Sequence, residues 1–158
     1  MHGSFSQKTR LLYVPVIERC AVFKTKTTEF RESISYWGGE AKPRMQGAGV
    51  LKAFDLNGRE VWAKAARYPI VGSVLSTAGD LVFVGHATGE FAAYDARSGD
   101  ALWQFMTGSG IRGGPISYRV NGKQYVAVPS GWGGWLKGFA PELYAAPRGM
   151  TLFVFALP

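Results

Sequence analysis

The sequence predicts an all-β protein made of similar sheet units stacked side by side. Four residue types, a small residue, a turn aspartate, a turn glycine and a tryptophan, occur twice in the same order: Ala53, Asp55, Gly58 and Trp62, then Ala93, Asp95, Gly99 and Trp103. The two aspartates are 40 residues apart, and such a period is typical of repeated β-units. The 21 glycines show no collagen-like period and suit a chain with many tight turns.

Each copy of this pattern reads as a strand, a tight turn and a second strand. An aspartate carboxylate accepts hydrogen bonds from backbone N–H groups two or three residues further on, and glycine adopts positive φ at little steric cost. We therefore expect chain reversals at 55–58 and 95–99. The small alanine leaves room for the indole of a neighbouring unit, which is a large apolar body with one N–H donor. Two ordinary hairpins with buried tryptophans are the alternative.

The remaining strands follow at a spacing of about ten residues, as expected for a propeller or a sandwich. The β-prone runs cover residues 11–16, 49–55, 60–66, 72–76, 81–85, 90–95, 101–106, 115–120, 123–128 and 150–157. Turns separate successive runs, most clearly at Asn121-Gly122, which is a strong hairpin signal. The polar stretch 24–44 is expected to be irregular, and only 141–146 has any helical tendency.

A third, degraded copy of the pattern is expected at the carboxyl end of the chain. Aligning Gly149 with Gly49 places Phe153 at the alanine position and removes the aspartate. Counted in four-stranded units, the chain supplies about two and a half, which are too few to close a ring. Such an incomplete repeat array usually needs a cap or a neighbour.

Composition and charge exclude several classes of protein. The net charge is +7 and the isoelectric point is near 9.7, but lysines and arginines are scattered singly instead of forming the stripe that nucleic-acid binding requires. A weak attraction to an acidic protein partner stays open. The sequence has no run of 18 apolar residues, so no membrane span is expected, and its first residues do not read as a signal peptide.

No catalytic or metal-ligating residue is predicted in this chain. Cys20 is the single cysteine, which excludes an intrachain disulfide and a cysteine-based metal site. His2 and His86 are far apart and match no metal-binding spacing. We interpret both histidines as structural or surface residues, and we expect Cys20 to be a buried small hydrophobic residue.

Several segments of the sequence resemble a known protein family. The segments that carry the resemblance are Gly72 to Gly85, Ala93 to Asp95, Leu102 to Phe105, Thr107 to Ile111 and Gly122 to Val128. They are similar to the last part of the pyrroloquinoline quinone (PQQ) dependent alcohol dehydrogenases of the methanol and ethanol type. Residues 5–15 and 149–158 fit as well, so the resemblance covers nearly the whole chain, less closely at 21–45.

This resemblance implies a fold, a cofactor and a reaction. The chain, 1–158, would be one incomplete part of an eight-bladed propeller domain in the periplasm, joined by tryptophan-docking repeats. PQQ would lie in a central funnel beside Ca²⁺ or a lanthanide. The metal-polarised quinone would take a hydride from a small primary alcohol, with an aspartate as base, and electrons would pass to a cytochrome c.

The resemblance also implies which residues contact the cofactor. The segment from Ser130 to Trp135 takes the place of the family segment that brings glycine and tryptophan to the quinone. Glycine lets backbone approach a flat ligand and an indole can lie against it, so Trp135 with Gly134 is the predicted cofactor contact. The alternative is that Trp132 and Trp135 only fill the propeller core.

Two positions depart from the family pattern. Glu18 stands where the family usually has an asparagine that reaches the quinone, and Val71 stands where it commonly has a tryptophan. A carboxylate at the first position would repel the acidic cofactor unless it is protonated or paired. The metal ligands, the vicinal cysteines and the base aspartate of the family belong to earlier segments, so none is assigned here.

Three hypotheses follow. The chain is a part of a PQQ alcohol dehydrogenase that is inactive without the missing blades, a non-catalytic propeller scaffold that binds proteins, or a relic that does not fold stably. The glycine and tryptophan segment favours the first of these.

Overall fold

The structure is a computed structural model that describes residues 1–158 except 19, 35, 37, 44–48, 132–148 and 157–158. Its strands are β1 (Ser4–Ser6), β2 (Leu11–Ile17), β3 (Ala21–Thr25), β4 (Gly39–Pro43), β5 (Gly49–Phe54), β6 (Glu60–Ala66), β7 (Val74–Ser76), β8 (Leu81–Gly85), β9 (Glu90–Asp95), β10 (Ala101–Met106), β11 (Ile116–Val120), β12 (Lys123–Ser130) and β13 (Thr151–Ala156).

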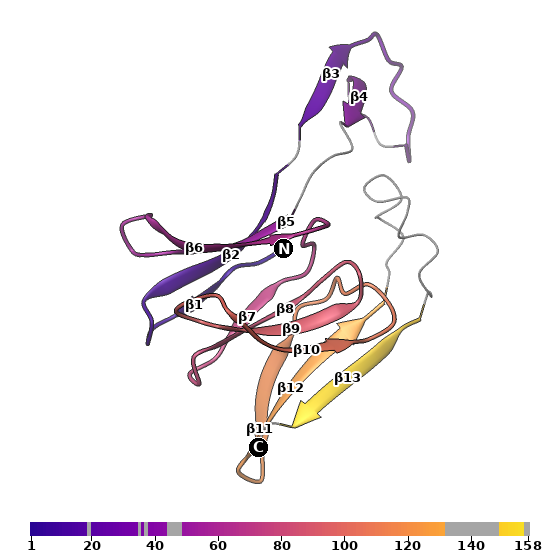
Figure 1. Cartoon of the computed structure of the whole chain (residues 1–158). Helices are drawn as coiled ribbons and strands as arrows, with labels where there is room; N and C mark the ends of the chain where they lie inside the picture. Colours follow the sequence, from indigo (N-terminus) through magenta and orange to yellow (C-terminus); the bar gives the residue numbers. More distant parts are fainter. Residues whose placement is uncertain (19, 35, 37, 44–48, 132–148, 157–158) are drawn as a thin grey trace.

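These strands form three stacked sheets and a separate hairpin (Figure 1). The first sheet has the order β1-β2-β5-β6, the second β7-β8-β9-β10 and the third β11-β12-β13, while β3 pairs with β4. All of these pairs are antiparallel. The expected all-β fold of about two and a half four-stranded units is therefore confirmed. In the described part of the chain no helix is long and apolar enough to cross a membrane.

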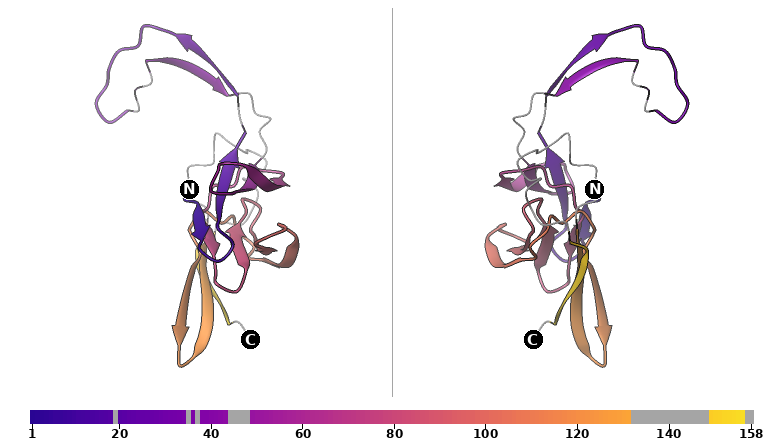
Figure 2. Two further views of the ribbon diagram at one scale, coloured as in Figure 1. Left: turned by 90° about the vertical axis from the view of Figure 1, so that its left-hand side faces the viewer. Right: turned by 90° about the vertical axis from the view of Figure 1, so that its right-hand side faces the viewer.

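Three strands were absent from the sequence-based expectation. β1 has only three residues, too few for a recognisable alternation. β4 falls in the stretch expected to be irregular, and β3 runs into its start. The five residues of β3 are all exposed, so this part of the hairpin has no buried face and leaves no hydrophobic pattern in the sequence. It projects away from the stacked sheets (Figure 2).

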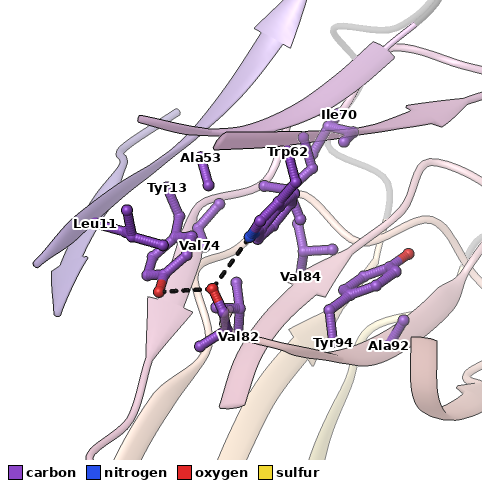
Figure 3. Close-up of a cluster of buried hydrophobic side chains, with 12 residues drawn as sticks. Leu11, Tyr13, Ala53, Trp62, Ile70, Val74, Val82, Val84, Ala92 and Tyr94 are labelled. Carbon is purple, nitrogen blue, oxygen red and sulfur yellow. Dashed lines mark hydrogen bonds between the residues drawn. The ribbon is translucent and has the colours of Figure 1, made fainter. Parts of the chain in front are cut away.

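Each sheet buries side chains against the next one. We call the face turned toward the next sheet the forward face and the opposite one the rear face. The core between the first two sheets joins forward-facing Leu11, Tyr13, Leu51, Ala53 and Trp62 to rear-facing Val74, Val82, Val84, Ala92, Tyr94 and Ala96 (Figure 3). A second core, between the second and third sheets, contains Phe83, Phe91, Ala93, Ile111, Val126 and Val128, with Phe153 and Phe155 packed against it.

The same pairs of residue types recur on both faces of all three sheets. On the forward face an aromatic residue lies opposite an alanine: Tyr13 and Ala53, Phe83 and Ala93, Tyr125 and Ala156. On the rear face an aliphatic residue lies opposite an aromatic one: Leu12 and Phe54, Val82 and Tyr94, Val126 and Phe155. The repeat is thus visible in cross-strand pairs as well as in the sequence.

This register corrects the predicted alignment of the third copy. Ala156, not Phe153, takes the place of Ala53 and Ala93, because Phe153 and Phe155 pack in the core against the second sheet. The alignment was off by an odd number of residues, and such a shift turns every side chain of a strand to the other face.

Trp62 joins the first sheet to the second. Its Nε1 donates a hydrogen bond to the carbonyl oxygen of Ala96 at 3.1 Å, and the Tyr13 hydroxyl donates to the same oxygen at 3.0 Å (Figure 3). A Cβ on Gly99 would lie only 2.7 Å from the indole. The expected docking of the indole on a neighbouring unit is confirmed for Trp62, which is 8% exposed.

The small residue that receives the indole differs from the expected one. Ala53 is the cross-strand partner of Trp62 within its own sheet, so the alanine makes room for the tryptophan of its own unit. The neighbouring unit contributes Gly99 and the Ala96 carbonyl instead.

Trp103 occupies the corresponding place at the next interface and is 39% exposed. Its ring lies edge-to-face against Phe155 of the third sheet, with 5.0 Å between centroids, and against Phe91 at 6.1 Å. It is in contact with the neighbouring sheet but less covered than Trp62.

The predicted chain reversals are confirmed. The Asp55 carboxylate accepts hydrogen bonds from the backbone N–H groups of Asn57 and Arg59 at 2.8 and 2.9 Å. The Asp95 carboxylate accepts from Arg97 and Ser98 at the same two distances, 2.8 and 2.9 Å. These backbone hydrogen bonds, that of Ser98 foremost, lower the pKa of Asp95.

Candidate functional site

The inner strands of the first two sheets lie side by side and define an inner edge of the stack. The Ser4 and Ser76 hydroxyls are 2.7 Å apart, and the Ser76 N–H donates to Ser4 Oγ at 3.0 Å. The Val74 N–H donates to the His2 carbonyl at 3.1 Å. β1 and β7 are therefore held together where the sheets converge.

Glycines allow the connections between sheets to meet at one end of this inner edge. A Cβ on Gly72 would lie 3.3 Å from the Gly85 carbonyl oxygen and 3.5 Å from that of Gly113. A Cβ on Gly114 would lie 3.1 Å from the Ser73 side chain. The start of β11 is thereby brought next to the start of β7, so all three sheets approach one another at this end.

A network of hydroxyl groups fixes the end of β12 at the same place. Ser130, which is buried, donates through Oγ to the Ser109 carbonyl at 2.8 Å, and Thr107 Oγ1 donates to the Gly89 carbonyl at 2.8 Å. The Gly131 N–H donates to the Gly110 carbonyl at 2.9 Å. The strand end that leads into the predicted cofactor-binding segment is therefore anchored to the second sheet.

The predicted cofactor contacts themselves, Trp135 and Gly134, lie outside the described residues, as does Trp132, and the assignment stays a prediction. Both ends of their segment are described. Ser130 pairs with Thr151, and a Cβ on Gly131 would lie 2.7 Å from the Gly149 carbonyl oxygen. The segment thus leaves and re-enters the third sheet at one point beside the inner edge.

The structure describes both residues that depart from the family pattern, Glu18 and Val71, and both lie at this same end of the sheets. The Glu18 carboxylate follows β2 and lies 3.5 Å from Lys52 Nζ, which is also 3.1 Å from Glu60. Glu60 foremost, and Glu18 to a lesser degree, raise the pKa of Lys52. Glu18 is therefore paired with a lysine. Pairing is one of the two conditions under which a carboxylate at this position would not repel an acidic ligand. Val71 is half-buried between β6 and β7.

A histidine that we expected to be structural also lies at this end. His86 Nε2 is 3.0 Å from the Tyr94 hydroxyl, and its backbone carbonyl accepts hydrogen bonds from Gly89 and Ile111 at 3.1 and 3.0 Å. Burial lowers the pKa of His86 and, together with a smaller effect of Glu90, raises the pKa of Tyr94 to about 12. The imidazole is thus held neutral between the first two sheets.

This burial predicts a specific dependence of stability on pH. A histidine whose folded pKa lies below its unfolded value of about 6.5 contributes its full stabilisation above that pH and loses it as the pH falls. Between pH 7.5 and 5.5 the free energy of unfolding should drop by at most about 1.4 kcal/mol through this group. Urea titrations should show that His86→Gln removes the drop, and an unchanged drop in the variant would contradict the assignment.

The described residues contain no group of three or more His, Cys, Asp and Glu side chains that could hold a metal ion. Any metal ligands would therefore have to come from outside the described residues. Cys20 is an exposed free thiol directly before β3, so the expectation that it is buried is wrong, because the strand that follows it has no buried face.

Comparison with known proteins identifies the family. The model of the PQQ family, described as "Glucose/ethanol/alcohol dehydrogenase, beta-propeller domain", matches residues 49–126, from β5 into β12. The chain belongs to this PQQ β-propeller family. The prediction of a partial propeller, made from the repeats and the resemblance, is confirmed.

Similar proteins support this family assignment over nearly the whole chain. The quinoprotein alcohol dehydrogenase PedH of Pseudomonas putida is 36% identical over 100% of this chain and 28% of its own length. The quinoprotein ethanol dehydrogenase of Pseudomonas aeruginosa is 37% identical over 98% of this chain and 26% of its own length. The solved structure of a europium-containing methanol dehydrogenase superposes with a TM-score of 0.88 at 31% identity, covering 98% of this chain and 32% of that one. The chain of this PQQ β-propeller protein thus spans about a quarter to a third of these relatives.

Proposed function

We propose that this chain is the carboxyl-terminal section of a PQQ-dependent alcohol dehydrogenase that oxidises primary alcohols to aldehydes in the periplasm. One observation carries the proposal: similarity to quinoprotein alcohol dehydrogenases over 98% or more of this chain coincides with two and a half repeated sheets that converge at a glycine-lined inner edge. The described residues contain no group that could hold a metal ion, and we expect the section to be inactive in isolation.

The role of this section is to hold one side of the cofactor. When bound, PQQ supplies the two-electron acceptor and Ca²⁺ or a lanthanide supplies the Lewis acid. Trp135 and Gly134 contact the flat ring system from the segment between β12 and β13. Ser130 and Gly131 fix the start of that segment through their hydrogen bonds to Ser109 and Gly110. Lys52, which pairs with both Glu60 and Glu18, reduces the negative charge that would otherwise face the cofactor's carboxylates.

Electrons leave to a cytochrome c in this proposal. Among the relatives, one is named quinohemoprotein alcohol dehydrogenase and another is a dehydrogenase subunit of an alcohol dehydrogenase (quinone), names that are compatible with a haem partner.

The proposal is tested by grafting the chain in place of the matching section of the Pseudomonas aeruginosa quinoprotein ethanol dehydrogenase. The chimera, loaded with PQQ and Ca²⁺ or a lanthanide, should reduce dye with ethanol, whereas the isolated 158-residue chain should not. In the chimera Trp135→Ala should lower PQQ retention at least tenfold, and Phe23→Ala on the exposed hairpin should leave it unchanged.

Each outcome of these experiments distinguishes between the three hypotheses. A chimera that folds but retains no PQQ would favour the alternative, a non-catalytic scaffold built from the same repeats. Turnover by the isolated chain would refute the claim that the reaction centre depends on the missing blades. A chain that shows no cooperative unfolding would support the relic hypothesis.

A further inference from the structure

The two ends of the stack expose sheet faces that match the buried ones. At one end, the forward face of the third sheet carries Tyr125 opposite Ala156, the same pair type that the first two sheets bury against their forward neighbours. Around it lie the exposed side chains of Ile116, Tyr118, Val120, Leu152 and Val154. The rings of Tyr118 and Tyr125 stack on this face with 5.4 Å between their centroids.

At the other end, the rear face of the first sheet carries Leu12 opposite Phe54. This is the pair type that the second and third sheets bury as Val82 with Tyr94 and Val126 with Phe155. Leu12 is 42% exposed. The one lysine of β5, Lys52, is paired on this side with Glu60 and Glu18 at 3.1 and 3.5 Å, so packing a sheet here would not bury an unpaired ammonium group.

The interior of the stack shows how two such faces fit. Twice, a forward aromatic and alanine pair meets a rear pair of an aliphatic and an aromatic residue: Tyr13 and Ala53 meet Val82 and Tyr94, and Phe83 and Ala93 meet Val126 and Phe155. The free forward pair and the free rear pair are the two halves of a third interface of this kind. The two faces lie at opposite ends of the stack, so they cannot pack against each other within one chain. They can pack against the matching faces of a second copy.

We propose that the 158-residue chain associates head to tail, with the forward face of the third sheet of one copy packed on the rear face of the first sheet of the next. The contact is heterologous, because each copy uses a different surface on its two sides. Such contacts produce rings when the rotation closes and open chains when it does not. This inference concerns the free faces alone and does not depend on PQQ binding.

The first test is the mass of the purified chain. Light scattering after size exclusion, at concentrations from about 1 to 100 μM, should show species heavier than the 17.2 kDa of one chain, with a mass that rises with concentration. A constant mass of 17.2 kDa over this range would overturn the proposal, and the two faces would then be left to the missing blades of the propeller.

The decisive test uses two complementary variants. Val154→Glu places a charge on the forward face of the third sheet, and Leu12→Glu places one on the rear face of the first. Each keeps the opposite face intact. Because burying an uncompensated charge is costly, each variant alone should associate at least about 100-fold more weakly. Mixed in equal amounts, they should form a heterodimer of twice 17.2 kDa and nothing larger, since only one pair of faces remains functional.

The mixture also controls for misfolding, since two misfolded variants would not complement each other. Phe23→Asp, on the exposed hairpin, is the matched control and should associate like the parent chain. If Phe23→Asp abolishes association, or if the two face variants associate as the parent does, the contact lies elsewhere and the proposal is wrong. A mixture in which both variants stay monomeric would also overturn it.

Discussion

Trp62→Ala is expected to lower the free energy of unfolding by about 3–5 kcal/mol, the range for removing a large buried aromatic side chain. The indole is 8% exposed and lies between Tyr13, at 5.7 Å between ring centroids, and the Gly99 backbone. Its removal would leave a cavity at the boundary between the first two sheets, where neither side can close without moving a whole sheet. Since small domains have about 5–15 kcal/mol of stability in total, the variant should be close to the limit of folding.

Trp62→Phe separates the hydrogen bond from the packing. The Ala96 carbonyl oxygen would keep its hydrogen bond from the Tyr13 hydroxyl at 3.0 Å, so losing the indole N–H leaves no buried acceptor without a donor. We expect a smaller loss, about 1–2 kcal/mol, from one hydrogen bond and a reduced ring. Urea titrations followed by far-ultraviolet circular dichroism would measure both variants at one low protein concentration, because association adds apparent stability.

Trp103→Ala is the matched control for Trp62→Ala. Its side chain is 39% exposed, and its ring contacts the rings of Phe155, Phe91 and Phe105. The loss should be smaller than that of Trp62→Ala by at least about 1 kcal/mol, in proportion to the smaller buried area. Equal losses for the two variants would contradict the difference in docking.

The features that local chemistry dictates were predictable from the sequence. The turn aspartates accept hydrogen bonds from residues two to four positions away. Such short-range geometry depends on the types of neighbouring residues and can therefore be predicted from the sequence. The ten β-prone runs became strands for the same reason. β3 was missed because its five exposed residues leave no hydrophobic period to recognise.

Registers between distant segments were less predictable. Residues 152–156 of β13 are apolar on both faces of the strand, so their pattern fits either face equally well. Only the pairing with β12 shows that Ala156, opposite Tyr125, is the counterpart of Ala53. The same limitation explains why sequence could not separate Trp62 from Trp103: the carbonyl and the glycine that receive Trp62 come from another unit, 34 or more residues away.

The candidate site was predictable in part. The resemblance identified the end of the sheets where Glu18, Val71 and Gly131 occur, and the registers of β2, β7 and β12 bring these to one end of the stack. The partner of Glu18 could not be foreseen, since Lys52 is on a strand paired across the sheet. The hydroxyl network of Thr107, Ser109 and Ser130 depends on contacts between sheets and has no sequence signature.

Gly99→Ala is the second substitution with a large expected effect. Gly99 has a φ of +73° and its added Cβ would lie 2.7 Å from two carbon atoms of the Trp62 indole. The left-handed backbone alone costs a non-glycine residue about 1–2 kcal/mol. The clash adds to this, because the indole is rigid and wedged between two sheets, and overpacking of this kind costs about 1–3 kcal/mol. We expect a total loss of about 2–5 kcal/mol in a urea titration.

Gly58→Ala isolates the clash from the backbone strain. Gly58 occupies the same turn position in the first sheet, with a φ of +79°, and its Cβ would meet nothing within 4 Å. Its loss should therefore be only the backbone cost of about 1–2 kcal/mol. Equal losses for Gly58→Ala and Gly99→Ala would show that the indole does not rest on Gly99.

A double-mutant cycle tests the contact itself. In a chain that already carries Trp62→Ala, the added Cβ at Gly99 has no indole to meet, so Gly99→Ala should then cost no more than Gly58→Ala does. The coupling between the two sites should equal the clash of about 1–3 kcal/mol. Because Trp62→Ala alone is expected to be marginal, the cycle is best measured with a stabilising osmolyte present throughout, which shifts all variants in the same direction. Additive losses would mean that the two residues do not touch, and the docking of the first sheet on the second would then depend on Tyr13 and the aliphatic core instead.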